Sequence, residues 1–165
     1  MKINIRPYTK IDAETIVAIL NYYIADSTAL YDYEARTLEQ QQNIFEEKLK
    51  KGFHVIVATI EERVVGFGYY SEFRFREAYK FTVEHSVYVS PNEHGKGIGK
   101  VIMQNLIRLA KEQKLHTMIG VIDAENESSI AFHEQFGFTT VGIIKESGYK
   151  FDRWLHSVIM QLMLN

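Results

Sequence analysis

The stretch His94-Gly95-Lys96-Gly97-Ile98-Gly99 carries three alternating glycines and separates a strand-like segment from a helix-like segment. Glycine lets a backbone approach a ligand closely and adopt positive φ. The first N–H groups of a helix have no acceptor inside the helix, so they can bind an anion. The helix dipole and Lys96 add positive potential. This stretch therefore predicts a pyrophosphate site, with a glycine-rich turn that binds nothing as the alternative.

Two well-known phosphate motifs do not fit this stretch. A Walker loop needs G-x-x-x-x-G-K-[ST], but Gly99-Lys100 is followed by Val101, and residue 94 is not glycine. A dinucleotide fingerprint counted from Gly95 would need its third glycine at Lys100. The loop also follows four predicted strands instead of the first one, unlike the loop of a dinucleotide-binding fold.

The apolar periodicity on both sides of the loop predicts an element order of β-α-α-β-β-β-α-β-α-β-β. Capping-box spacing at Thr9 and at Thr37 marks the first two helices, and the second of these carries Leu38, Phe45 and Leu49. Two further helices are predicted over residues 97–114 and 126–136. Strands are predicted over residues 3–5, 54–59, 64–73, 80–90, 116–122, 141–145 and 155–164. This order predicts an α/β protein with a mixed sheet and helices on both faces.

The strand predicted just before the loop alternates strictly between its two faces. Glu84, Ser86 and Tyr88 lie on one face, and His85 lies on the other with apolar neighbours. The pattern places Glu84 mid-strand in a cavity-facing row with Ser86 and Tyr88. A strand glutamate that faces solvent or pairs with an arginine is the alternative. His85 is interpreted as a packed histidine.

Composition limits the classes of function. The 165 residues include 19 Lys+Arg and 21 Asp+Glu, a net charge of −2, and no cysteine. We expect one domain over residues 1–165, no nucleic-acid partner, and no disulfide or thiolate metal site. The six histidines are dispersed, so no metal is expected. No signal peptide and no apolar stretch of roughly 18 residues is apparent, so we expect a soluble cytoplasmic protein without a membrane partner.

The chain resembles the GNAT superfamily of acetyl-CoA-dependent N-acetyltransferases, whose pyrophosphate loop reads Q/R-x-x-G-x-G/A; here His94 takes the first position. The likeness is closer to the phosphinothricin and methionine sulfone/sulfoximine acetyltransferase branch. It is carried by residues 19–24, 82–89, 126–138 and 148–151 together with Trp154. Asp152 and His156 depart from that branch, which often has Gly and Asp there. The resemblance implies a GNAT fold, with a mostly antiparallel sheet of about six to seven strands and about four helices, and a homodimer.

The resemblance also implies roles for individual residues. Glu84 takes the position of the family's base, and His133 takes that of the residue that protonates the leaving thiolate, with a merely structural histidine as the alternative. Asn126 bonds the pantetheine and also caps a helix. The expected acetyl-CoA contacts are Val87, Tyr88, Val89, His94, Gly95, Lys96, Gly97, Ile98, Gly99, Lys100, Asn126 and His133.

An amino-acid acceptor needs its carboxylate bound, and an arginine does that with two parallel hydrogen bonds. Arg74 is the first candidate and Arg76 the second, in a basic and aromatic segment that could equally be a surface loop. The expected substrate contacts are Arg74, Phe75, Arg76, Glu77, Ala78, Tyr79 and Glu84.

The sequence therefore indicates acetyl transfer to the α-amine of a small amino acid or analogue, such as phosphinothricin, methionine sulfoximine or methionine sulfone, by direct attack. The alternatives are a protein N-terminus, polyamine or aminoglycoside as acceptor, or a non-catalytic acyl-CoA-binding module.

Overall fold

Seven strands form one continuous sheet in the order β1-β2-β3-β4-β5-β7-β6 in the computed structural model, which describes all 165 residues. Their bounds are β1 Asn4–Pro7, β2 Val55–Ile60, β3 Arg63–Glu72, β4 Thr82–Val89, β5 Thr117–Asp123, β6 Thr139–Lys150 and β7 Arg153–Met163. All neighbouring pairs are antiparallel except β4 and β5, which are parallel. The expected mixed and mostly antiparallel sheet is confirmed.

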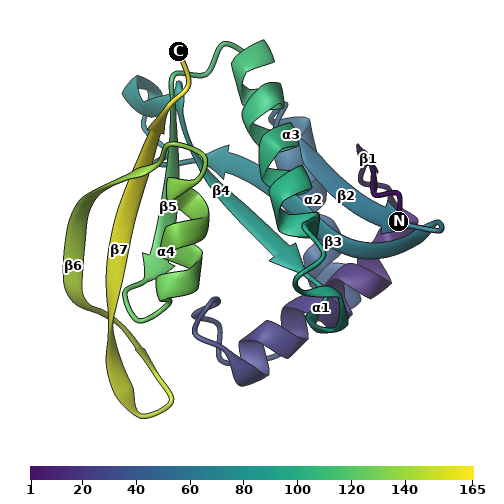
Figure 1. The fold of residues 1–165 in the computed structure, drawn as a ribbon, viewed down its shortest axis with the longest axis horizontal. Coiled ribbons are helices and arrows are strands. Elements are labelled where there is room, and N and C mark those ends of the chain that lie inside the picture. Colours follow the sequence, from purple (N-terminus) through teal and green to yellow (C-terminus); the bar gives the residue numbers. More distant parts are fainter.

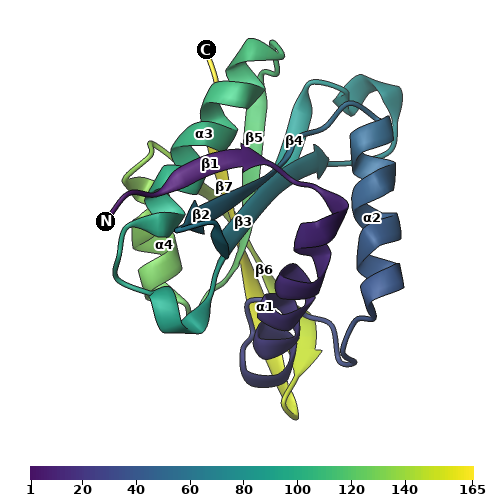
Figure 2. The same ribbon diagram turned by 90° about the vertical axis from the view of Figure 1, so that its right-hand side faces the viewer.

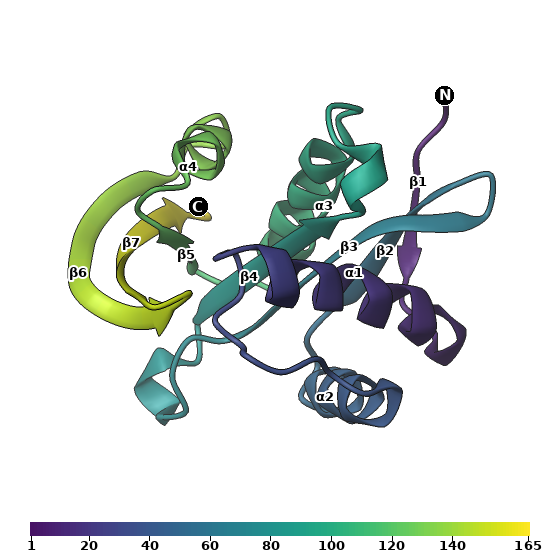
Figure 3. The ribbon, with the colours of Figure 1, turned by 90° about the horizontal axis from the view of Figure 1, so that it is seen from below.

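Four α-helices cover the two faces of this sheet. They are α1 Ala13–Asp26, α2 Leu38–Lys50, α3 Ile98–Glu112 and α4 Glu127–Glu134. Helices α1 and α2 lie on one side, and α3 and α4 lie on the other (Figures 2 and 3). The expected number of helices and their distribution over both faces are confirmed. None of the helices combines the length and the apolar character needed to cross a bilayer.

The capping box predicted at the start of α2 is present. Thr37 Oγ1 accepts the N–H of Gln40 at 3.1 Å, and Gln40 Oε1 accepts the N–H of Thr37 at 2.9 Å. Of the three apolar side chains expected to mark this helix, only Phe45 is buried, whereas Leu38 and Leu49 are exposed. Burial on this helix thus depends on packing against the sheet and not on apolar character alone.

Helix α3 packs directly against two glycines of β3, Gly66 and Gly68. A Cβ on Gly68 would lie 2.5 Å from the side chain of Ile102, and one on Gly66 would lie 2.9 Å from the Tyr88 carbonyl oxygen. Neither position could hold a larger residue without a shift of the helix or the neighbouring strand. The close packing fixes where the N-terminus of α3 lies relative to β4.

The parallel pair β4 and β5 is short, and this opens the sheet. Their register runs from Thr82 opposite Thr117 only to Glu84 opposite Ile119, although β4 continues to Val89 and β5 to Asp123. Figure 1 shows the two strands close together at one end and diverging toward the other. The divergence leaves backbone groups and side chains of both strands without a neighbouring strand.

The hairpin of β6 and β7 extends past the rest of the sheet and contacts the segment that follows α1. The buried ammonium group of Lys150 donates to the carbonyl oxygens of Ser27 (2.8 Å) and Leu30 (2.6 Å). The hairpin turns at Phe151 and Asp152, which have φ of 54° and 56°. Asp152, one of the two departures from the branch that the chain resembles, therefore has a left-handed backbone, and Asp is one of the few residues other than Gly that adopt this conformation readily.

Candidate active site

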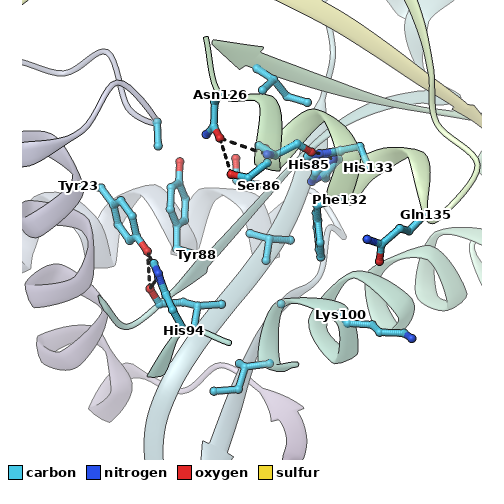
Figure 4. A pocket seen from close by; sticks show the side chains of 18 of the residues that line it. Tyr23, His85, Ser86, Tyr88, His94, Lys100, Asn126, Phe132, His133 and Gln135 are labelled. Carbon is cyan, nitrogen blue, oxygen red and sulfur yellow. Dashed lines mark hydrogen bonds between the residues drawn. The ribbon is translucent and has the colours of Figure 1, made fainter. Parts of the chain in front are cut away.

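A cleft of about 790 Å³ lies where β4 and β5 diverge. Its walls come from β4, from the glycine loop and the first turn of α3, from the end of β5 and from α4 (Figure 4). Of the twelve expected acetyl-CoA contacts, eleven line this cleft: Val87, Tyr88, Val89, His94, Gly95, Gly97, Ile98, Gly99, Lys100, Asn126 and His133. Residues from four separate segments are thus brought to one place.

The glycine loop presents a run of unpaired backbone N–H groups. Between His94 and Lys100 no backbone N–H bonds to a backbone carbonyl, and the first such bond is from Val101 to Gly97 at 3.2 Å. Gly95 and Gly97 have φ of +78° and +76°, and a Cβ on either would meet no atom within 4 Å. Open space over several free N–H groups at a helix N-terminus is the geometry that binds a pyrophosphate. The loop therefore fits the diphosphate of acetyl-CoA.

Two lysines lie at the loop: Lys96 forms an ion pair and Lys100 does not. Lys96 Nζ lies 2.6 Å from the buried carboxylate of Glu93, and Arg63 contacts the same carboxylate at 2.8 Å. These hydrogen bonds, from Lys96 first and then Arg63, lower the pKa of Glu93. Lys96 is the one expected acetyl-CoA contact outside the cleft lining. Lys100 is exposed at the rim and has no ion-pair partner (Figure 4).

A tyrosine from α1 links the loop to β4. Tyr23 donates its hydroxyl proton to the Val89 carbonyl oxygen at 2.6 Å, so His94 Nε2, 2.8 Å from the same hydroxyl, must donate to it. Burial raises the pKa of Tyr23 to about 12, so the hydroxyl stays protonated. His94 thus takes a defined place at the first position of the loop.

The edge of β4 that faces the cleft has free peptide groups. Ser90 donates to Val65 of β3, and Thr82 accepts from Phe73 at the end of β3, so even-numbered residues of β4 direct their peptide groups toward β3. Odd-numbered residues therefore direct theirs toward β5, which no longer pairs with β4 beyond Glu84. The peptide groups of Val87 and Val89 face the cleft, as the expected main-chain contacts to pantetheine require.

Asn126 caps α4 with one end of its amide. Its Oδ1 accepts from the N–H of Ser129 at 3.1 Å and from Ser128 Oγ at 3.0 Å. The NH₂ group has no partner in the protein and remains available to a ligand in the cleft. The cap and the expected pantetheine contact therefore use different atoms.

Glu84 lies one residue before the part of β4 that lines the cleft, on the face of α1 and α2. Burial raises the pKa of Glu84, and the charges of Arg74 and then Lys48 lower it by less. The guanidinium of Arg74 stacks on the ring of Phe73 at 4.6 Å and has no acidic partner. Arg74 and Phe75 line a separate hollow of about 420 Å³, shared with Lys48 of α2. The structure brings Arg74 near Glu84 but not into the cleft.

The other expected substrate contacts are further out. Arg76, Glu77, Ala78 and Tyr79 are exposed and lie in or beside a 3₁₀ turn at Glu77–Tyr79. They line neither the cleft nor the hollow.

His133 lies at the inner end of the cleft, on the opposite face of the sheet from Glu84. Its Nδ1 is 2.6 Å from the Ser129 carbonyl oxygen, and its Nε2 is 3.0 Å from Nε2 of His85. His85 also lines the cleft and is more than a packed side chain. No group of three or more His, Asp or Glu residues is arranged to hold a metal ion.

Sequence patterns missed three residues that shape this region. Tyr23 and Lys150 act through hydrogen bonds to carbonyl groups 66 and 120 to 123 positions away. His85 meets His133 across 48 positions. The only local sign of each of these residues was a polar side chain among apolar positions. Such a sign does not predict which residue the side chain contacts.

The family model described as "Acetyltransferase (GNAT) family" matches residues 16–138. An L-methionine sulfoximine/L-methionine sulfone acetyltransferase of Pseudomonas aeruginosa is 36% identical over 166 residues, which cover 100% of this chain and 96% of the relative. A phosphinothricin acetyltransferase of Sinorhizobium meliloti, solved in complex with AcCoA, aligns with a TM-score of 0.96 at 34% identity, covering 100% of this chain and 90% of that one.

A second solved structure is similar to a comparable degree. It is a ribosomal-protein-alanine N-acetyltransferase of Brucella melitensis, with a TM-score of 0.96 and 38% identity over 97% of this chain and 99% of that one. The similar proteins thus carry names with two kinds of acceptor, a small amino-acid analogue and a protein.

Proposed function

The chain belongs to the acetyltransferase (GNAT) family, and on that premise we propose that it transfers the acetyl group of acetyl-CoA to the α-amine of a small amino acid or amino-acid analogue. The observation that carries the cofactor half of this proposal is the run of free N–H groups from His94 to Lys100 at the mouth of the cleft. The observation that carries the acceptor half is Arg74, an unpaired guanidinium whose charge acts on Glu84.

The residues divide the reaction between the two faces of the sheet. The loop and Lys100 hold the diphosphate, and the peptide group of Val87 and the N–H of Val89 align the pantetheine and the thioester between β4 and β5, since Tyr23 already donates to the Val89 carbonyl oxygen. The N–H of Val87 is the donor that we assign to the developing oxyanion. This arrangement leaves the thioester carbonyl open toward the face where Glu84 lies.

Glu84 acts as the general base, directly or through a water. An alkyl ammonium has no lone pair, so a proton must leave before the nitrogen attacks the carbonyl carbon. Glu84 takes the first proton of the ammonium, and the free amine then attacks the carbonyl carbon to form the N–C bond and the oxyanion. When this intermediate collapses, the C–S bond breaks, the sulfur leaves with the electron pair, and the second proton of the nitrogen passes to solvent or to the thiolate. Burial holds the pKa of Glu84 above its ordinary value, which makes the carboxylate a better proton acceptor.

Arg74 binds the acceptor carboxylate in this proposal. A planar guanidinium pairs with a carboxylate through two parallel hydrogen bonds, and it orients the α-amine toward Glu84. Methionine sulfoximine, methionine sulfone and phosphinothricin are the acceptors that the similar enzymes suggest.

The test is thiol release from acetyl-CoA with a panel of free amino acids, their amides and peptides. We expect Arg74→Ala to raise KM for the free amino acids about tenfold or more, because the substrate carboxylate loses a bidentate charged partner, and a tenfold change corresponds to about 1.4 kcal/mol. The KM for acetyl-CoA should stay the same, since Arg74 lies outside the cleft. Amides should be poor substrates of both proteins.

A protein N-terminus is the second candidate acceptor, favoured by the similarity to the Brucella melitensis enzyme. A peptide amine has no adjacent carboxylate for Arg74 to bind. If amides or peptides react faster than free amino acids, this second acceptor replaces the first.

We also propose that the enzyme is a cytoplasmic homodimer. The location follows from its need for acetyl-CoA, which is made inside cells. The dimer is supported by β6, a twelve-residue edge strand on which Val141, Ile143 and Ile144 are all more than half exposed. An edge strand with exposed apolar side chains is usually covered in a stable protein.

A further inference from the structure

Two buried histidines from different elements meet at the inner end of the cleft. His85 of β4 and His133 of α4 are 7% and 6% exposed, and their Nε2 atoms are 3.0 Å apart. This is the hydrogen bond that joins α4 to β4 across the gap where β4 and β5 no longer pair. Figure 4 shows the two rings together behind the cleft.

The geometry determines where the protons of this pair are. His133 Nδ1 lies 2.6 Å from the carbonyl oxygen of Ser129, which can only accept, so Nδ1 carries a proton. In a neutral ring Nε2 of His133 is then a bare acceptor, and the proton between the two rings belongs to His85 Nε2. That leaves Nδ1 of His85 without a proton, and this buried atom has no partner in the protein.

The surroundings of the pair keep it neutral. Glu84 on β4 points to the other face of the sheet, β5 presents Gly120 and Ile122, and Phe138 packs edge-on to both rings. Burial, and then the charge of His133, lowers the pKa of His85 to about 3, and burial also lowers the pKa of His133. The buried Asp123 at the end of β5 lines the same cleft, but neither ring forms a hydrogen bond or an ion pair with a carboxylate.

The space for the pair is built into β5. A Cβ on Gly120 would lie 3.2 Å from His133 Cδ2, 3.2 Å from His85 Nε2 and 3.3 Å from His133 Nε2. Each distance is tighter than an ordinary contact, so a side chain at this position would push the rings apart. The absence of a side chain at position 120 is therefore matched to the two rings.

We propose that His85 is a positioning residue for the acetyl-transfer site, which fixes His133 as the neutral Nδ1–H tautomer and ties α4 to β4 at the inner end of the cleft. This inference rests on the proposed function for its role in the reaction. With its N–H bound to Ser129 and its lone pair bound to His85, His133 has no proton to give to the leaving thiolate. His133 instead holds the wall that carries Asn126, and the thiolate takes its proton from solvent or from the acceptor amine.

The first test reads the protons directly in the wild-type protein. We expect ¹⁵N NMR of the histidine rings to show His133 protonated at Nδ1 and bare at Nε2, with both rings neutral at neutral pH because burial lowers the pKa of each. An Nε2–H tautomer of His133, or its titration near neutrality, would overturn the proposal. This measurement needs no variant and no substrate, so it decides the tautomer even if no acceptor amine is found.

The second test compares two variants of the positioning residue. His85→Phe keeps the ring volume and removes the donor, so we expect the pKa of His133 to rise by about one unit or more, because the lone pair loses its hydrogen bond. The pH profile of kcat/KM should then gain a second acidic limb. His85→Gln offers an N–H in the donor's place and should keep the wild-type pKa of His133 and the wild-type profile.

Two results of this comparison contradict the proposal. One is a His133 pKa in His85→Phe equal to that of wild type; the other is a His85→Gln variant that behaves like His85→Phe. A lack of acetyl transfer to every amine in the panel would instead contradict the proposed function, while the NMR results would still stand for or against the pair.

Discussion

Replacing Gly97 by alanine tests the anion-binding loop with the smallest possible change. Gly97 precedes α3 with φ of +76°, and a Cβ there would meet no neighbouring atom within 4 Å. The cost to the free protein is therefore conformational and not steric. An L-residue in the left-handed region costs roughly 1–2 kcal/mol. For a protein of this length that lowers Tm by about 2–8 °C, at roughly 2–4 °C per kcal/mol.

The effect on the ligand is additional to this cost. The methyl group occupies the open space over the free N–H groups, and relaxation of φ to a negative value would turn those groups away from the anion. We expect the Kd for acetyl-CoA to rise by about tenfold or more, which corresponds to about 1.4 kcal/mol.

Gly52 provides a matched control because it has the same left-handed backbone conformation as Gly97 but lies outside the cleft. It follows α2 with φ of +84°, a Cβ there would also meet nothing within 4 Å, and it does not line the cleft. Gly52→Ala should lose a similar amount of stability and bind acetyl-CoA like wild type. Calorimetric titration gives Kd, and thermal unfolding with and without acetyl-CoA gives the linked shift in Tm. A Gly97→Ala variant that loses Tm like the control but keeps the wild-type Kd would refute the assignment of the loop.

Three other predictions concern the loop, the base and the dimer. Gly99→Ala should bind acetyl-CoA like wild type, because its Cβ would make only ordinary contacts of 3.6 Å with Val89 and Phe132; a large loss of affinity would argue against this packing. Glu84→Gln should lower kcat by roughly 10²–10⁴-fold. Since the base must be ionised, the wild-type rate should fall as pH decreases through the raised pKa of Glu84. The variant should lack this acidic limb of the pH–rate profile. A variant whose rate stays within a few-fold of wild type at every pH would exclude Glu84 as the base. Ile143→Glu should convert the proposed dimer into monomers in sedimentation equilibrium, because it adds a charge to the exposed edge strand β6. A wild-type protein that is already monomeric would rule the dimer out.

The amino-acid sequence by itself predicted the helices and strands and the position of the glycine loop between β4 and α3. The capping box of Thr37 and Gln40, the alternation along β4 and the three glycines at the start of α3 all act within a few residues of chain. Such features depend on local hydrogen bonds and on the period of the backbone, so they can be read without knowing the fold. For this reason we could predict the order of the seven strands along the chain and the place of the anion site.

Only the tertiary structure decided which of these features meet. The strand order places β7 between β5 and β6, and the short β4–β5 pairing opens the cleft. The contact of His85 with His133 depends on both and on the missing side chain at Gly120. Likewise, the sequence predicted that Lys96 contacts the pyrophosphate. In the fold Lys96 instead forms an ion pair with the buried carboxylate of Glu93. Burial and distance between side chains far apart in the chain are set by how the sheet and helices pack, and no local pattern carries that information.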